Sequence, residues 1–383
     1  MPGEFQIVTS QSWISRILGS FGGFFLGLFL VPVSIVILFW NEGHFVETYK
    51  TLIEGQALVI EAPASEILTA NEGKLVHVIG DVDVGDGVTD DDLGISTKAI
   101  RLKRIVKIFQ WQEHAKSQTE KVMGGSDKTV TTYTYDQTWS ENLTPSSEFK
   151  DKTGHENPAH VDYESLTLEA PDARVGAYSL QPAHIAKLNR FTPLAITQAP
   201  EAASWPEEAT LAQGEIYLGA DPKSPKIGDI RISFEVVSEK KLSLVARQEG
   251  QSFVPYEAQS GGSIEFFESG QHSSAEMFAS AQSDNTVFTW VIRIAGVLVS
   301  IIGFNLIFGP ISVIADVIPL VGSLVGFASG GISILLGAAL SAASIGVAWV
   351  FFRPLIGGAL LALAIAAVVA VFQIRSKKAE AAH

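Results

Sequence analysis

The sequence predicts a multi-pass α-helical membrane protein with four spans and a large β-rich α+β domain between spans 1 and 2. Residues 18–40 contain no charged side chain, and the 88 residues 287–374 contain only three. A helix needs about 20 apolar residues to cross the hydrocarbon core of a bilayer. The first stretch therefore has room for one span, and the second has room for three. Residues 41–285 instead show the short alternating runs and turn residues that are typical of strands.

Residues 1–17 are a polar N-terminal lead, and residues 18–40 form the first span. This span is longer than a signal-peptide core and has no Ala-x-Ala cleavage site, which favours a retained anchor. Gly19, Gly23 and Gly27 recur every four residues, on one helix face. Small residues at that spacing allow helices to approach closely in lipid. Because glycine is also simply common in membrane helices, the sequence alone does not decide whether this face packs against another helix.

The middle region, residues 41–285, is acidic. It carries a net charge of −17, which follows from −14 for the chain, zero for residues 1–40 and +3 for residues 286–383. An acidic surface repels nucleic acid, which we exclude as a partner. Two runs, 229–237 and 242–247, predict a hairpin. The Pro- and Ala-rich stretch 192–209 is typical of a linker or a long loop, and as a linker it would divide the region into two subdomains.

The C-terminal apolar block divides unequally. Residues 287–308 predict the second span, 324–352 the third and 355–374 the fourth. Residues 310–323 are apolar but too short to cross, which predicts an interfacial or re-entrant segment. The tail 375–383 begins with a basic cluster, so the positive-inside rule places the tail and residues 1–17 in the cytoplasm. The acidic domain is then extracytoplasmic, in the periplasm of a bacterium or the organelle lumen of a eukaryote.

Polar side chains at membrane depth are costly, and they usually face protein or water. The candidates are Arg293, Asn305, Asp316 and Arg353. We expect Arg293 to extend toward the interface, and Asp316 either to pair with a cation or to mark a re-entrant loop. A pore would need more polar lining than these spans offer, so ordinary interface positions are the favoured interpretation.

No sequence pattern indicates an enzyme, a cofactor or a strong metal site. Asp81, Asp83, Asp86 and Asp92 have the density of a calcium loop, but their order does not fit an EF-hand, and a solvated acidic loop is favoured. His155 and His160 are five residues apart with Pro158 between them, which does not fit a zinc-protease helix. The absence of cysteine excludes disulfides and thiolate chemistry.

Several short motifs run in order along the chain and together resemble the transmembrane protein 43 family, also called LUMA. The resembling motifs are Asn41-Glu42-Gly43, Glu54-Gly55, residues 71–80 (NEGKLVHVIG), Leu102-Lys103-Arg104, Phe109-Gln110-Trp111, Tyr133-Thr134-Tyr135 with Trp139, Gly154-His155 with Asn157-Pro158, residues 228–234 (GDIRISF), Ala246-Arg247-Gln248, Val254-Pro255, Gly303 with Asn305-Leu306, and residues 352–355 (FRPL). The lack of cysteine, the short N-terminus and the Ala-rich composition point to a bacterial member.

The resemblance implies a membrane anchor, an outward domain and oligomerisation. In eukaryotes the family implies the endoplasmic reticulum and inner nuclear membrane, with nuclear-envelope partners that a bacterium lacks. Together with the absence of catalytic motifs, it predicts a non-enzymatic scaffold that self-associates and contacts membrane lipid and other membrane proteins. The alternatives are a channel or transporter subunit and, with less support, a lipid-linked envelope-stress sensor.

Overall fold

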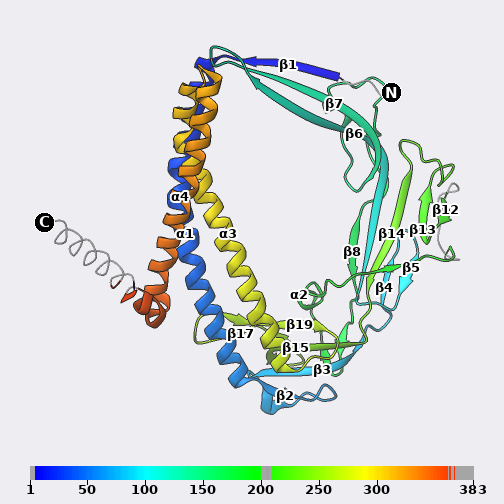
Figure 1. Ribbon diagram of the computed structural model, residues 1–383. Helices are drawn as coiled ribbons and strands as arrows, with labels where there is room; N and C mark the ends of the chain where they lie inside the picture. The colour runs from blue at the N-terminus through cyan, green and yellow to red at the C-terminus, as the bar shows by residue number, and fades with distance from the viewer. Residues whose placement is uncertain (1–4, 200–204, 206–208, 361, 364–365, 367–383) are drawn as a thin grey trace.

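The computed structural model describes residues 5–199, 205, 209–360, 362–363 and 366. Three long helices stand side by side in a bundle: α1 (Trp13–Leu58), α3 (Ser274–Ala315) and α4 (Pro319–Phe352) (Figure 1). Each contains a stretch long and apolar enough to cross a membrane. Ser12 caps α1, and Ser273 with Glu276 forms a capping box on α3, so polar side chains satisfy the first N–H groups of both helices.

Glycines let α1 and α3 approach closely. A Cβ atom on Gly27 would overlap the carbonyl oxygen of Gly303, and one on Gly23 would lie 3.5 Å from Leu306. Gly19 has open space around it. The predicted glycine face of the first span is thus divided: two of its residues lie against α3, and the third does not.

The helix boundaries in the C-terminal block differ from the predicted ones. The interfacial segment at residues 310–323 was a wrong expectation, because α3 continues to Ala315 and α4 begins at Pro319. Pro310 lies inside α3, and only residues 316–318 separate the two helices. Two apolar helices meeting at a tight turn leave no segment to lie flat in the interface. The predicted fourth span, 355–374, lies largely outside the described residues.

The β region forms two main sheets with interleaved sequences. The larger sheet contains β1 (Phe5–Gln11), β6 (Arg101–Lys121), β7 (Asp127–Ser140), β8 (Leu166–Glu169), β11 (Thr192–Leu194), β12 (Ala209–Ala212), β13 (Glu215–Leu218) and β14 (Ile230–Val237). The smaller contains β2 (Ile60–Ala62), β3 (Leu75–Asp83), β9 (Arg174–Val175), β10 (Tyr178–Ser179), β15 (Lys241–Glu249), β16 (Ser252–Val254) and β19 (Phe266–Ser269). β2 and β3 pair in parallel, and the other pairs are antiparallel.

Smaller elements complete the region. Two short ribbons pair β4 (Val88–Asp90) with β5 (Ile95–Thr97), and β17 (Tyr256–Glu257) with β18 (Ser263–Ile264). A four-residue helix, α2 (Pro182–Ile185), covers the core of the smaller sheet. Each main sheet has its own apolar cluster: Val76, Val78 and Leu244 belong to the smaller sheet, and Ile216 and Phe234 to the larger.

Two expectations about this region were wrong. The runs 229–237 and 242–247 do not form a hairpin, because β14 pairs within the larger sheet and β15 within the smaller one. The stretch 192–209 does not begin as a linker, because Thr192–Leu194 form β11, which pairs with β14. The two main sheets do not correspond to two successive parts of the chain, because the chain enters each of them more than once.

A long ribbon connects the larger sheet to the far end of the bundle. The smaller sheet lies at the foot of the helices, whereas β6 and β7 arch over to the other end, where β1 pairs along β7 (Figure 1). The 21 residues of β6 extend about 70 Å, close to the length of about 69 Å of the 46-residue α1. The prediction that residues 41–285 lie wholly on the opposite side from residues 1–17 does not fit this arrangement.

Candidate functional site

Glu42 is the centre of a polar cluster that joins all three long helices. Its carboxylate is fully buried and accepts hydrogen bonds from Arg293 Nε at 2.6 Å and Nη2 at 2.9 Å. Trp349 Nε1 of α4 donates to the same carboxylate at 2.7 Å. A bidentate Arg–carboxylate pair is strong and fixes orientation, so this pair sets the register of α1 against α3. We call Glu42, Arg293, Trp349 and Arg353 the foot cluster.

Arg353 adds a second guanidinium to this carboxylate. Its Nη2 lies 3.7 Å from Glu42 Oε2 and makes no hydrogen bond within the described residues. The guanidinium instead lies 4.3 Å from the centre of the Phe45 ring, in cation–π geometry. The foot cluster therefore contains two cations and one anion.

The two neighbours of Glu42 also hold the helices together. Asn41 donates to the carbonyl oxygen of Thr289 at 3.2 Å. A Cβ atom on Gly43 would lie 2.8 Å from the Phe352 ring, so a larger residue would displace α4. All three residues, Asn41, Glu42 and Gly43, lie inside α1. The sequence analysis did not identify Glu42. A signal was available, because an acidic residue directly after an apolar span is a candidate ion-pair partner for Arg293 and Arg353, which lie within or at the ends of the other apolar stretches.

Asp316 is the centre of a second cluster, at the opposite end of the bundle. Its buried carboxylate lies 2.6 Å from Arg16 Nη2 of α1 and 2.6 Å from Lys121 Nζ of β6. Arg16 Nε also lies 2.9 Å from Asp127 at the start of β7. Asp316 thus lies between two cations, one of which comes from the β region. We call Arg16, Lys121, Asp127 and Asp316 the tip cluster.

Backbone contacts seat the β6–β7 turn on the same helix ends. The Gly124 N–H donates to the Val317 carbonyl oxygen at 3.3 Å, and Trp13 Nε1 donates to the Val313 carbonyl oxygen at 2.9 Å. Gly125 has φ of +80°, and a Cβ atom there would overlap the Trp13 ring. Glycine is required at this position both for the backbone conformation and for the close approach of Trp13.

The remaining sequence candidates do not converge. Asn305 is exposed on α3, in neither cluster. Asp81 lies 3.7 Å from Lys241, Asp83 accepts from the Gly85 N–H, and Asp92 pairs with Arg104. No group of three or more His, Asp or Glu side chains in the described ranges has the arrangement of a metal site.

The two histidines considered for a zinc site, His155 and His160, have different neighbours and do not contact a common group. His155 stacks on Tyr135 with ring centres 4.0 Å apart, whereas His160 is exposed and lies 3.4 Å from Asp162. Burial, followed by the hydrogen bond to Glu113, raises the pKa of Tyr135 to about 12. Its hydroxyl therefore remains a neutral donor that ties Glu113 to the loop at Asp151. This arrangement is structural, since it provides no activated nucleophile.

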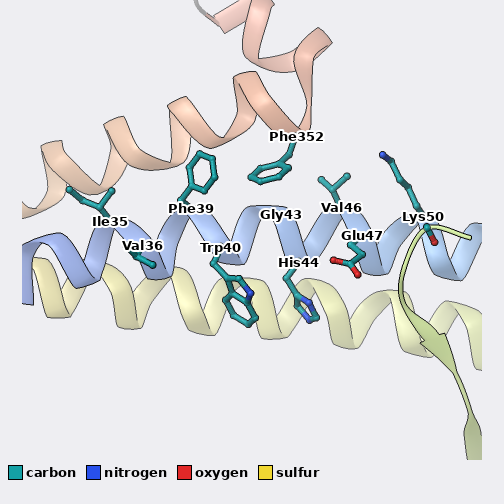
Figure 2. A pocket seen from close by; sticks show the side chains of 11 residues that line it. Ile35, Val36, Phe39, Trp40, Gly43, His44, Val46, Glu47, Lys50 and Phe352 are labelled. Atoms are coloured by element: carbon teal, nitrogen blue, oxygen red, sulfur yellow. The ribbon is translucent and has the colours of Figure 1, made fainter. Parts of the chain in front are cut away.

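A groove runs along α1 beside the foot cluster (Figure 2). Its cavity of about 620 Å³ is lined by apolar residues such as Phe39 and Phe352 at one end and by Glu47 and Lys50 at the other. Trp40 and His44 stack with ring centres 5.1 Å apart and point toward α3. This change from apolar to charged lining follows the end of the uncharged stretch 18–40 in α1.

The sequence comparisons place these features in a family. A family model for transmembrane protein 43 matches residues 108–354. Transmembrane protein 43 of Rattus norvegicus is 29% identical over 381 residues, which are 96% of this chain and 94% of the rat protein. The Homo sapiens protein is 28% identical, over 97% of this chain and 95% of its own length. The Drosophila melanogaster homologue is 28% identical, over 88% and 90%.

No solved structure matches the chain. The family model covers well over half of the residues. It includes Arg293, Trp349 and Arg353 of the foot cluster but not Glu42. The resemblance that the short motifs indicated is therefore confirmed: the chain belongs to the transmembrane protein 43 family.

Proposed function

We propose that this protein is a non-enzymatic membrane scaffold that self-associates and presents its β region to partners. The observation that carries the proposal is the attachment of the β region to the bundle at both ends. The smaller sheet adjoins the foot of α1 and α3, and the tip cluster ties β6 and β7 to the other end. A region held at two points about 70 Å apart is well suited to hold a fixed orientation toward other membrane components.

Surfaces for self-association are open in the described chain. Gly326 and Gly331 of α4 have no neighbouring atoms where a Cβ would lie, so another helix has room to approach there. The outermost strands of the larger sheet, β1 and β12, each have one unpaired edge within the described residues. Both features favour contact between copies, and the small residues of α4 are the more suitable inside a bilayer.

The mass of the purified particle tests this proposal. Mass photometry of the full chain in nanodiscs should show oligomers, and Gly326→Leu should shift them toward monomer. Gly309→Leu is the matched control, because Gly309 is an equally open helical glycine on α3. A monomeric wild-type particle at micromolar concentration would remove self-association from the proposal. Equal oligomers in both variants would exclude the Gly326 face of α4.

The proposed location is the cytoplasmic membrane, with the foot of the β region in the periplasm and with membrane lipid and other membrane proteins as partners. In a eukaryote the corresponding location is the endoplasmic reticulum or inner nuclear membrane. The family is one of membrane proteins, and the buried polar clusters link structural elements rather than surrounding a reactive group. These observations support a role outside catalysis.

The ribbon gives a specific reason to keep a channel subunit as the second candidate. Residues 114–121 of β6 are exposed and mostly polar, yet they end at the tip cluster, where Lys121 pairs with Asp316 at the end of α3. Polar strands at membrane depth require protein or water around them, not lipid. Copies that assemble with these ribbons facing one another would surround a water-filled path.

Ion flux distinguishes the two candidates. For a channel, proteoliposomes containing the full chain should conduct ions, and Asp316→Asn should change the flux because it releases the ribbon. Asp162→Asn, on an exposed loop, is the control and should leave the flux unchanged. Flux no greater than that of empty liposomes would exclude conduction and leave the scaffold.

A further inference from the structure

The foot cluster carries one positive charge more than its carboxylate neutralises. Glu42 is within 4 Å of both Arg293 and Arg353, and no other carboxylate in the described residues comes within that distance of either guanidinium. The side chains of Arg293 and Arg353 are 13% and 21% exposed. Mostly buried cations are poorly solvated by water, so an additional anion would stabilise the cluster.

The cluster lies at the boundary between the apolar and polar parts of the bundle. Glu42 comes two residues after the uncharged stretch 18–40, and Arg353 follows directly on α4. Trp290 and Trp349 lie beside Arg293, with ring centres 4.9 and 5.8 Å from its guanidinium. Tryptophan and arginine together at the end of a span are typical of the level of lipid headgroups.

An apolar groove begins at this cluster and runs between α3 and α4. Its cavity of about 520 Å³ is lined by Trp290, Arg293, Ile294, Leu298, Ile345 and Trp349 among others. Arg293 and Trp349 lie at the foot end, and Leu298 lies about 7 Å further along α3. Gly346 forms part of the groove wall, and nothing lies within 4 Å of the position where its Cβ would be.

We propose that this groove is a binding site for an anionic glycerophospholipid. The phosphate pairs with Arg293 at the foot end of the groove, and an acyl chain lies along the groove toward Leu298. Arg353 contributes its unneutralised charge from behind the groove wall, where its guanidinium lies 5.7 Å from the centre of the Trp349 ring. The excess positive charge selects an anionic over a zwitterionic lipid, since only the former neutralises the cluster. The apolar lining selects a lipid over a soluble phosphate, which could use only the charged end of the groove at Arg293. This site does not depend on self-association or on conduction.

Thermal unfolding of the delipidated full chain in detergent tests the site. Added phosphatidylglycerol should raise the Tm of the wild type, and phosphatidylcholine should not. Arg353→Gln removes the excess cation but keeps the Glu42–Arg293 pair, so it should fold and bind phosphatidylglycerol about fivefold more weakly. Arg247→Gln, in the β region, is the matched control and should retain the full shift.

A second variant tests the groove independently of charge. Gly346→Leu should fill the space of the acyl chain without a clash and so abolish the phosphatidylglycerol shift, whereas Gly309→Leu should not. Native mass spectrometry gives a test that needs no variant: the wild type should retain bound phosphatidylglycerol. Equal shifts with both lipids, an unchanged shift in Arg353→Gln, or the same shift with glycerol 3-phosphate alone would overturn the proposal.

Discussion

Glu42 holds three helices through one buried carboxylate, and its removal should be far more costly than the loss of a surface charge. Glu42→Gln leaves Arg293 and Arg353 without a counterion, and breaking a buried pair costs about 3–5 kcal/mol. Glu249→Gln, in the exposed pair with Arg247, should cost under about 1 kcal/mol. Unfolding in a graded series of detergent mixtures measures the difference. Equal stability of the two variants would mean that the foot cluster does not bear on helix packing.

His184 makes the β region sensitive to acid. Its Nδ1 accepts from the Gln181 N–H at 3.1 Å and its Nε2 lies 3.2 Å from Glu265, so the neutral ring satisfies both neighbours. Burial lowers the pKa of His184 below its ordinary 6.5, and Glu265 opposes this shift. The unfolded chain therefore takes up the proton first, and the contribution of His184 to stability is complete above about pH 6.5 and decreases below it.

The corresponding measurement compares Tm at pH 7.5 and pH 5.5. His184→Gln keeps polar groups in place but does not titrate, so it should lose less Tm on acidification than the wild type does. Both chains share every other titratable group, which makes the difference specific to His184. A wild-type loss no larger than that of the variant would contradict a lowered pKa.

At the scale of helices and strands, local sequence patterns predicted the elements but did not predict which elements pair with one another. Runs of uncharged residues predicted the apolar parts of α1, α3 and α4, and short alternating runs predicted strands within residues 41–285, because each pattern reflects which faces of an element are apolar. Residues 238–240 look like a hairpin turn because nothing local indicates that β14 and β15 belong to different sheets. Similarly, Glu42 and Asp316 acquire their partners only when residues 251 and 195 positions away fold against them.

The β6–β7 ribbon should detach from the bundle when the tip cluster loses its charge. Asp316→Asn leaves Arg16 and Lys121 without their shared carboxylate, which opens the contact more often. Trypsin cleaves after Lys121 only when the turn is accessible, and its rate follows the population of the open form. Cleavage there should be at least about tenfold faster than in the wild type.

Two features make this test specific. Asp162→Asn removes a carboxylate that is 79% exposed and contacts only the similarly exposed His160, so its cleavage pattern should match that of the wild type. Gly125→Ala should act as Asp316→Asn does, because its Cβ would overlap the Trp13 ring. Unchanged cleavage after Lys121 in both tip variants would show that the ribbon is held by other contacts.

For the whole molecule, the ribbon and the bundle together determine where each end of the β region lies relative to the bilayer. Because the chain contains no cysteine, single cysteines report on this directly. Met123→Cys marks the tip, where Met123 is 84% exposed, and Gln251→Cys marks the smaller sheet at the foot. With α1 crossing the bilayer and Arg16 beside Asp127, a membrane-impermeant maleimide should reach the tip only from the cytoplasmic side and the foot only from the other. Labelling of both positions from one side would mean that the tip cluster does not form in the membrane, and a channel lined by the ribbon would then lose its structural basis.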